Sequence, residues 1–450
     1  MPDERSGRAV PSGRLARFGS FGRLAGGVAG GMVAEGARRL AAGERPRMDD
    51  LLLTPANASR VADQLAHLRG AAMKLGQMIS MDAGDMLPPE LAQILARLRD
   101  NAHHMPPQQL DRVLASEWGR DWRRRFRHFQ AHPVAAASIG QVHRAELPDG
   151  RILAIKVQYP GVAASIDADV DNVATLLRVS GLLPRELEIA PLLEEAKQQL
   201  HEEADYGREL AMLERYRALV GDDPAYVVPT AEPSLSTSRV LAMEFIDGER
   251  IEALETRPQA ERDRAAGSLV ALVLRELFAW GTMQTDPNFA NYRWQADGQR
   301  LVLLDFGAAR VIRPTTRAGY HRLLMAALDG DHAAVRDAAI GAGFLGAAAA
   351  ERHRDGVDRM IEVILGELNR PGAFDFGDRG FVSVLREDAQ AMAQDRDTWH
   401  LPPIDTLFAQ RKISGTALLC ARLRARVDVR TMIAAYRTLP TIAGASDDAA

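Results

Sequence analysis

Two aspartates and an asparagine, at positions 286, 305 and 291, have the types and spacing that could bind a magnesium ion beside a phosphate ester. Asp286 and Asn291 stand five residues apart in "TDPNFAN", and Asp305 follows the apolar run "LVLL". A carboxylate held at the end of a strand and followed by glycine can present an oxygen ligand to Mg²⁺. A second aspartate nearby could accept the proton of an attacking hydroxyl group. The three residues therefore predict metal-assisted phosphoryl chemistry.

The tripeptide Asp-Phe-Gly occurs twice, at 305–307 and 375–377, and only the first copy has the context of a metal site. The first copy follows a predicted strand and lies fourteen residues after Asn291. The second copy, in "RPGAFDFGDRG", has proline and glycine around it, no strand before it and no Asp and Asn pair upstream. We therefore assign Asp305 as the ligand and expect Asp375 to be a loop residue without chemistry.

Lys156 lies on an apolar face of a predicted strand, where lysine is unusual. In "RILAIKVQ" the side chains of Ile152, Ala154 and Lys156 share one face, because strand side chains alternate. A lysine of an edge strand that points to solvent is the simpler interpretation of this residue alone. In the small lobe of a protein kinase, however, such a lysine holds the α- and β-phosphates of ATP. Followed by the three downstream residues, Lys156 reproduces in order four parts of a kinase site.

Two further segments of a kinase site have counterparts here, one of them altered. The predicted adenine-binding residues, where a strand ends, are Met243, Glu244, Phe245 and Ile246. The predicted phosphate loop is Ala135, Ala136, Ala137 and Ser138, in the place of a glycine-rich loop. Alanine does not easily adopt positive φ, so we expect a stiffer loop whose backbone amides near Ala137 face the phosphates. Thr285 also replaces the arginine that precedes the catalytic aspartate of kinases.

The composition indicates a globular protein of two or three domains. The chain has 450 residues, of which 46% are hydrophobic and 26% charged. A net charge of −4 gives no reason to expect nucleic acid, and the single cysteine excludes an internal disulfide or a multi-cysteine metal site. No stretch approaches the roughly 18 apolar residues of a spanning helix. We expect a cytoplasmic protein that contacts a membrane peripherally and does not cross it.

The elements before residue 220 form a helical segment followed by strands and then more helices. Helical periodicity covers 54–99, and a further helix is expected around 107–119. The segment 138–158 predicts two strands joined at Pro148-Asp149-Gly150. Helices are expected from Gly161 to about Arg217.

The rest of the chain is mainly helical. A strand pair is expected around 226–246, and short apolar runs at 292–294 and 301–304 interrupt the helices beyond Ile251. A small strand-rich lobe followed by a large helical lobe is a two-lobed α+β arrangement.

The first 47 residues form a basic leader with nine arginines against four acidic residues. Gly26 and Gly30, and likewise Gly27 and Gly31, stand four apart, which would let helix backbones approach closely. The leader is either a flexible basic segment or a helical segment attracted to anionic lipid. Composition leaves both alternatives open.

A set of motifs resembles one known family. The motifs are "KLGQ" (74–77), "AAAS" (135–138), "EADYGRE" (203–209), "DPNFAN" (286–291) and "DFG" (305–307). Together they are similar to the UbiB family of atypical protein-kinase-like proteins, in the branch of the coenzyme Q biosynthesis kinases, over roughly residues 12–435. Many members have His-Pro-Gly where this chain has Asn288-Phe289-Ala290, a departure that fits the coenzyme Q branch better than the bacterial type with C-terminal spanning helices.

The resemblance implies a two-lobed protein-kinase-like α+β fold with a helical N-terminal extension packed over the active site. It implies that Lys74 and Gln77 lie on this extension, where the lysine meets an acidic pair matching Glu203 and Asp205. It also implies that Glu209 pairs with the phosphate-binding lysine. The residues alone left five candidates for that partner, namely Glu194, Glu195, Glu202, Glu203 and Glu209. The expected domains are a leader (1–47), the extension (48–119), a small lobe (120–247) and a large lobe (248–450).

The function implied is an ATP- and Mg²⁺-dependent atypical kinase or ATPase that supports ubiquinone biosynthesis at the membrane surface. Its catalytic residues would be Asp286, Lys156 and Glu209, with Asn291 and Asp305 as metal ligands. Expected partners are ATP, anionic lipid and lipid-like quinone intermediates, with quinone-biosynthesis enzymes and a second copy of the chain as further candidates. The alternatives are a phosphotransferase acting on a small molecule or protein, and a nucleotide-gated scaffold.

Overall fold

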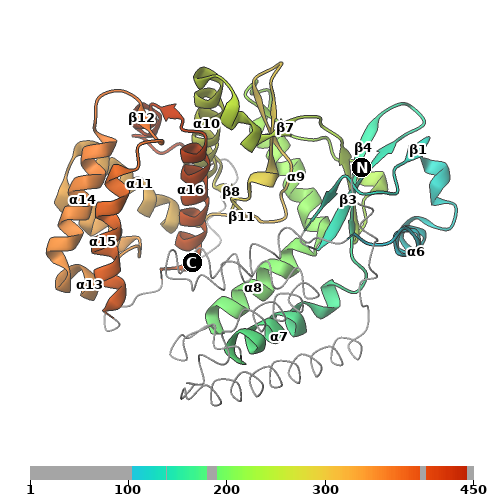
Figure 1. Ribbon diagram of the computed structural model, residues 1–450, viewed down its shortest axis with the longest axis horizontal. Helices are drawn as coiled ribbons and strands as arrows, with labels where there is room; N and C mark the ends of the chain where they lie inside the picture. The colour runs from blue at the N-terminus through green and yellow to red at the C-terminus, as the bar shows by residue number, and fades with distance from the viewer. Residues whose placement is uncertain (1–103, 138, 180–189, 396–401, 443–450) are drawn as a thin grey trace, which may run out of the picture. The chain divides into compact units, whose positions relative to one another are not determined.

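The computed structural model describes residues 104–137, 139–179, 190–395 and 402–442 (Figure 1). The predicted leader, most of the N-terminal extension with Lys74 and Gln77, and Ser138 lie outside the described residues. By its internal contacts the chain divides into two units. The first unit is the chain up to Ala211 together with Thr230–Phe245, and the second is Met212–Pro229 together with the chain from Ile246 onward.

The first unit contains an antiparallel five-stranded sheet. Its order is β1-β3-β4-β6, with β2 also paired to β3. The strands are β1 (His128–Phe129), β2 (Ala135–Ala136), β3 (Gly140–Glu146), β4 (Ile152–Gln158) and β6 (Val240–Glu244). The predicted hairpin within 138–158 is confirmed. Its turn holds Gly150 at φ +89°, a conformation that favours glycine.

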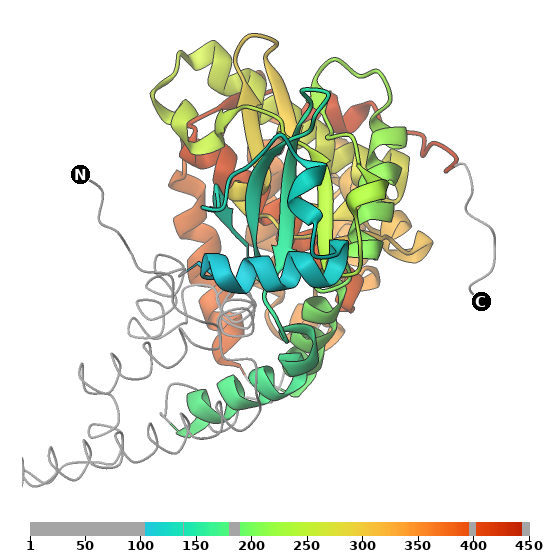
Figure 2. The ribbon, with the colours of Figure 1, turned by 90° about the vertical axis from the view of Figure 1, so that its right-hand side faces the viewer.

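Helices accompany the sheet of the first unit. The helix α6 (Pro107–Trp118), predicted from the sequence, crosses one face of the sheet (Figure 2). Trp118, Trp122 and Phe126 pack with Leu153 and Val240 in the core on that side. The remaining helices are α7 (Ile166–Val179), α8 (Ala190–Glu203) and α9 (Tyr206–Val220), and the unit boundary falls within α9.

The strand pair predicted around 226–246 is confirmed only in part, as an isolated antiparallel bridge between Ala231 and Met243. Strands do form, as β5 (Tyr226–Val227) and β6, but β6 pairs with β4 while β5 pairs in parallel with β10 (Arg300–Leu303). Two prolines and a 3-10 turn at Pro233–Leu235 separate the two strands. Strand partners are chosen by tertiary packing, so local sequence gave no information on them.

The second unit positions short strands among many helices. A four-stranded sheet runs β5-β10-β9-β7, with β7 (Glu249–Arg250) and β9 (Tyr292–Gln295). Two small ladders pair β8 (Thr282–Gln284) with β11 (Ala309–Val311), and β12 (Phe374–Asp375) with β13 (Arg426–Val427). The runs expected at 292–294 and 301–304 thus form the hairpin β9–β10.

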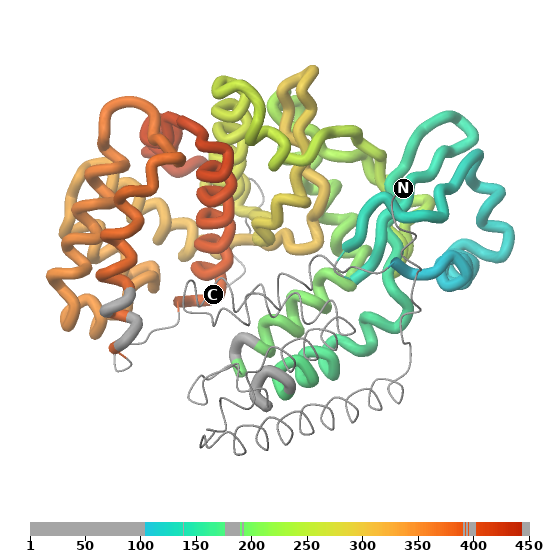
Figure 3. Tube along the Cα trace, viewed as in Figure 1, coloured from blue at the N-terminus to red at the C-terminus, as the bar shows by residue number. Residues whose placement is uncertain are grey.

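The longest helix of the second unit, α16 (Ile404–Arg422), packs along α10 (Gln259–Leu274) (Figure 1). A π-helical turn (Arg275–Trp280) extends α10. The others are α11 (Pro314–Asp329), α12 (His332–Gly341), α13 (Ala347–Arg352), α14 (Arg354–Leu368), α15 (Gly380–Gln394) and α17 (Val429–Ala434). Of these, α11 packs against α12 and α14, and α14 packs against α15 (Figure 3). No helix of the described residues is long and apolar enough to cross a membrane.

Candidate active site

Lys156 is a buried residue of a central strand, so the interpretation as a solvent-facing edge lysine is wrong. β4 pairs with β3 on one side and β6 on the other, and Lys156 is only 8% exposed. Its Nζ donates to both carboxylate oxygens of Glu209, each at 2.8 Å. Glu209 is itself 1% exposed. A buried lysine needs such a partner, because burial penalises an uncompensated charge.

The start of α9 fixes Glu209 at this distance. The Asp205 side chain accepts a hydrogen bond from the Arg208 amide at 2.9 Å, and its carbonyl accepts from the Glu209 amide at 3.0 Å. The ring of Tyr206 lies under Lys156, with Nζ 5.1 Å from the ring centre. Of the five glutamates that the residues left open, Glu209 is the partner of Lys156.

Gly140 is a residue of this arrangement that sequence reasoning missed. A Cβ at this position would lie 2.4 Å from the Val157 carbonyl oxygen and 2.9 Å from the Tyr206 hydroxyl. Glycine therefore permits the close approach of β3 to β4 and to the first residue of α9. A glycine inside a strand pattern, in "SIGQV", was the available signal.

The hairpin β9–β10 brings the two predicted metal ligands together. Tyr292 pairs with Leu303, and the Leu304 amide donates to the Asn291 carbonyl at 3.0 Å. Asn291 and Asp305 therefore flank the same end of one hairpin. The Asp305 Oδ1 accepts from the Gly307 amide at 3.0 Å, and the Asn291 amide group donates to the Asp286 carbonyl at 3.2 Å.

These two side chains fit a magnesium ion. Mg²⁺ prefers hard oxygen ligands and is commonly bound through one or two protein carboxylates together with substrate phosphates. One carboxylate and one amide oxygen, on residues at the same end of one hairpin, match that pattern. No group of three or more His, Cys, Asp or Glu suited to a metal occurs in the part of the chain described by the structure. A metal here would depend on phosphate oxygens for its remaining coordination.

Asp286 is held next to this pair by the small ladder of β8 and β11. Both the amide and the hydroxyl of Thr285 donate to the Ala308 carbonyl, at 3.1 and 2.8 Å. Asp286 directly follows Thr285, and Thr285 is bonded to Ala308, the residue after Asp305-Phe306-Gly307. The threonine that replaces the kinase arginine is buried and anchors the loop.

The alanine loop forms a short strand followed by a turn. Ala135 and Ala136 pair with Val142 and Gln141 as β2. The Ala137 amide donates to the Gly140 carbonyl at 2.9 Å. This hydrogen bond lies within the turn between β2 and β3, and the orientation of amides near Ala137 toward a phosphate stays a prediction. Contact of the loop residues with a nucleotide stays a prediction.

The predicted adenine-binding segment coincides with a boundary between the units, which falls between Phe245 and Ile246. Met243 pairs with Ala154 across β6 and β4. The Glu244 amide donates to the Thr230 carbonyl at 2.8 Å, and the Phe245 amide donates to the Ile152 carbonyl at 2.9 Å. Adenine binding by this segment stays a prediction, and those two amides are already bonded within the first unit.

Glu203 and Asp205, the acidic pair predicted to meet Lys74, precede Glu209 by a few residues. Glu203 is the last residue of α8, and the exposed Asp205 begins the turn into α9. Their expected contact with Lys74 lies outside the described residues.

Asp375, of the second Asp-Phe-Gly, is in a short strand, so the prediction of a loop is wrong. It pairs with Arg426, whose Nε donates to the carboxylate at 3.0 Å. Partial burial alone would raise the pKa of Asp375, but the Gly377 amide and Arg426 together hold that pKa below its ordinary value.

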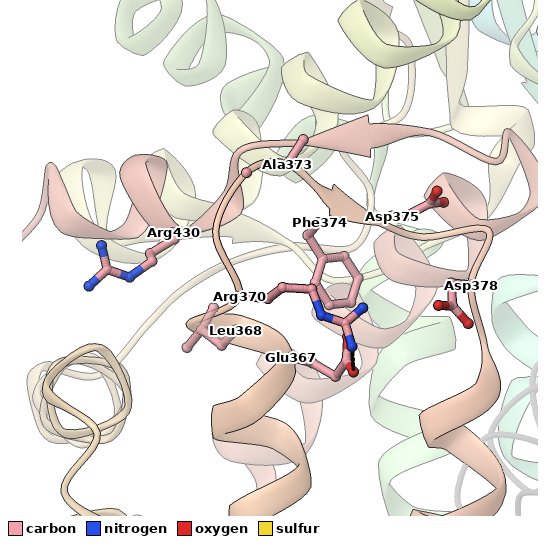
Figure 4. Close-up of a pocket in the computed structure, with 9 residues that line it drawn as sticks. Glu367, Leu368, Arg370, Ala373, Phe374, Asp375, Asp378 and Arg430 are labelled. Carbon is pink, nitrogen blue, oxygen red and sulfur yellow. Dashed lines mark hydrogen bonds and ion pairs between the residues drawn. The ribbon is translucent and has the colours of Figure 1, made fainter.

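A small pocket adjoins this second copy. Figure 4 shows Asp375 and Asp378 at one side of the pocket and the ion pair of Arg370 with Glu367 across it. The cavity is about 40 Å³. Ligand pockets usually span several hundred Å³. The second copy therefore has no room for a nucleotide.

Comparison with known proteins places these features in context. Residues 97–339 match the ABC1 atypical kinase-like domain. The yeast (Saccharomyces cerevisiae) protein named atypical kinase COQ8, mitochondrial, is 35% identical over 94% of this chain and 85% of its own. The Caenorhabditis elegans atypical kinase coq-8, mitochondrial, is 38% identical over 93% of this chain, which spans 56% of that relative.

A solved structure is also similar. Rv3197 of Mycobacterium tuberculosis, determined in complex with erythromycin, aligns with a TM-score of 0.56 and 27% identity, over 82% of this chain and 92% of that one. The likeness supports a two-lobed kinase-like α+β fold.

Proposed function

The chain belongs to the UbiB family of ABC1 atypical kinase-like proteins, and on that premise we propose that it binds Mg-ATP and hydrolyses it in support of ubiquinone biosynthesis. The observation that carries this proposal is the hairpin β9–β10, which sets Asn291 and Asp305 side by side. Kinase-like families bind nucleotides, and the retained ligands favour a nucleotide that is used with Mg²⁺.

Each residue has a separate role in the proposed reaction. Lys156, oriented by Glu209, would neutralise charge on the α- and β-phosphates. Asn291 and Asp305 would hold Mg²⁺, which stabilises negative charge on the phosphate oxygens. Asp286 would accept a proton from the attacking water molecule. The water oxygen would form a bond to the γ-phosphorus while the bond from that phosphorus to the ADP oxygen breaks. The products are ADP and phosphate.

The phosphoryl acceptor distinguishes this proposal from a phosphotransferase. If, as the family resemblance implies, an extension with Lys74 and Gln77 covers the site, it would obstruct a peptide, so we propose water as the acceptor. Labelled ATP with purified protein tests this directly. Free phosphate as the main labelled product is expected, whereas label in a protein or lipid fraction would support the phosphotransferase.

A scaffold role is tested in cells. A strain that lacks the gene would receive the wild-type chain or the Asp305→Asn variant, and its quinone would be measured. Restoration by the wild type alone supports a chemical role. Equal restoration by both would favour a nucleotide-independent scaffold.

We also propose peripheral membrane association through the basic leader. Nine arginines before residue 48 would be attracted to anionic lipid, and this attraction is screened by salt. Flotation with anionic vesicles would compare the full chain with one that starts at Met48. Full binding by the shortened chain would refute the role of the leader.

A further inference from the structure

A buried charged cluster lies in the second unit, outside the roles assigned above. Lys412 of α16 and Glu276 of the π-helical turn are 1% and 0% exposed at their side chains, with Nζ and Oε2 3.3 Å apart. Lys412 also donates to the Tyr292 hydroxyl at 2.6 Å and to Gln284 Oε1 at 3.4 Å. Glu276 Oε1 accepts from the Tyr216 hydroxyl at 2.8 Å and from the backbone amide of Gln284 at 3.2 Å. We name these five residues the Lys412 cluster.

Three members of the Lys412 cluster adjoin the candidate active site. They are Tyr292, which directly follows Asn291; Gln284, two residues before Asp286; and Tyr216, whose ring centre lies 5.0 Å from that of Phe306. The hydroxyl groups of both tyrosines are bonded to the charged pair, Tyr292 to Lys412 and Tyr216 to Glu276. The cluster thus connects α16 to a residue just before Asp286 and a residue just after Asn291, and through Tyr216 to Phe306, which follows Asp305.

A second contact of α16 is with the loop that contains Asp286. Gly415 lies three residues after Lys412, on the same side of the helix. A Cβ at Gly415 would lie 2.1 Å from the Cβ of Pro287, the residue that follows Asp286. Only glycine lets the helix approach the loop this closely. Further along the helix, the Arg422 guanidinium lies 5.9 Å from the ring of Phe289 in the same loop.

We propose that Lys412 and Gly415 are positioning residues, which hold the loop 284–292 in its reactive geometry without touching nucleotide. The inference rests on the proposed function. A buried cluster linked by an ion pair and several hydrogen bonds favours one arrangement of its members. Misplacing reacting groups by about 1 Å can cost about a hundredfold in rate. Neither residue lies within the matched stretch 97–339.

The alternative is that the ion pair only stabilises the fold, and paired substitutions separate the two. Lys412→Met alone leaves a buried carboxylate uncompensated and can prevent folding. Lys412→Met with Glu276→Gln removes both charges at similar volume, and the glutamine oxygen can still accept from Tyr216. We expect this double variant to fold.

The test uses the full chain, with hydrogen exchange of the 284–292 peptide and Mg²⁺-dependent ATP turnover. In the double variant we expect faster exchange in that peptide alone, kcat lower by about 10- to 100-fold, and KM for ATP within about threefold of wild type. A uniform rise in exchange, or wild-type exchange and kcat together, would overturn the inference.

A glycine pair supplies a matched control. Gly415→Ala should displace Pro287 and lower kcat, whereas Gly366→Ala on α14, where a Cβ meets nothing within 4 Å, should leave kcat unchanged. Equal turnover in the two variants would overturn the role of Gly415. If the wild type itself shows no ATP turnover, the proposed function fails; the exchange of 284–292 then still decides the positioning inference, since it needs no activity.

Discussion

The two Asp-Phe-Gly tripeptides have the same residues but different surroundings. Phe306 of the first is 1% exposed and packs against Tyr216, and Asp305 ends a hairpin beside Asn291. In the second, Phe376 is half-buried against Phe374, and Asp375 forms an ion pair with Arg426.

One local feature is common to both copies. Each aspartate accepts a hydrogen bond from the glycine amide two residues later, at 3.0 Å in the first and 2.9 Å in the second. The tripeptide therefore encodes the same turn in both places. The difference lies in the neighbouring residue: Asn291, at the same end of the β9–β10 hairpin, in the first copy, and Arg426, which is bonded to the carboxylate, in the second. A cationic partner neutralises the carboxylate and opposes metal binding.

The largest expected effect on nucleotide binding comes from removing one charge in each copy. Asp305→Asn should weaken Mg-ATP binding by about 100-fold or more, since the only predicted anionic ligand is lost. Asp375→Asn should change binding little, because Arg426 already occupies that carboxylate. Thermal shift with Mg-ATP, with EDTA as the metal-free control, measures both. Equal losses in the two variants would show that the wrong copy was assigned.

The aromatic residues should differ in their contribution to stability. Phe306→Ala removes a fully buried ring and should cost about 3–5 kcal/mol of unfolding free energy. Phe376→Ala removes a half-buried ring, so a smaller cost is expected. Chemical denaturation measures the two. Similar costs would mean that the surroundings of the second copy are as well packed as those of the first.

A single hydroxyl group next to the first copy should have an intermediate effect. Thr285→Val keeps the shape of the side chain but removes the buried hydrogen bond from Oγ1 to the Ala308 carbonyl. The expected loss is about 1 kcal/mol, because the Thr285 amide still bonds that carbonyl. Thermal unfolding and ATP turnover would be measured together. Unchanged stability would show that the hydroxyl does not anchor the loop.

Short stretches of the sequence were sufficient to predict some features of the fold. The hairpin of β3 and β4 could be predicted because its turn, Pro148-Asp149-Gly150, and its apolar strands lie within one short segment. Asp305 was preferred over Asp375 because the strand before it is apolar; that strand is confirmed, and the role of Asp305 as a ligand stays a prediction. The burial of Lys156 was only one of two interpretations, since its central position depends on β6, which is more than 80 residues later.

Other features depend on contacts between distant residues. The strand at Asp375 has two residues, and its partner Arg426 is 51 residues away. Lys412 and Gly415 have no local signal, because a lysine in a helix usually extends into solvent and a glycine there only lowers helix propensity. Their significance comes from Glu276 and Pro287, which reach them only in the folded chain.

The smallest expected effect concerns the ion pair of the second copy. The side chains of Arg426 and Asp375 are 61% and 39% exposed. Arg426→Ala should therefore cost less than about 1 kcal/mol at pH 7, and less still at high salt.

The direction in which the stabilisation by the Arg426–Asp375 ion pair changes with pH follows from the lowered pKa of Asp375. A carboxyl group whose pKa is lower in the folded state stabilises the fold above its ordinary value of 3.8, and this contribution is lost as the pH falls through the folded-state pKa. The difference in melting temperature between wild type and Arg426→Ala should thus be constant near neutral pH and shrink below about pH 4. Thermal unfolding across that range measures it, with Arg430→Ala, which removes an exposed hydrogen bond to Asn369 and no ion pair, as the control. A difference that grows on acidification would mean that Arg426 does not stabilise the charged form of Asp375, and that carboxylate would again be available to a metal ion.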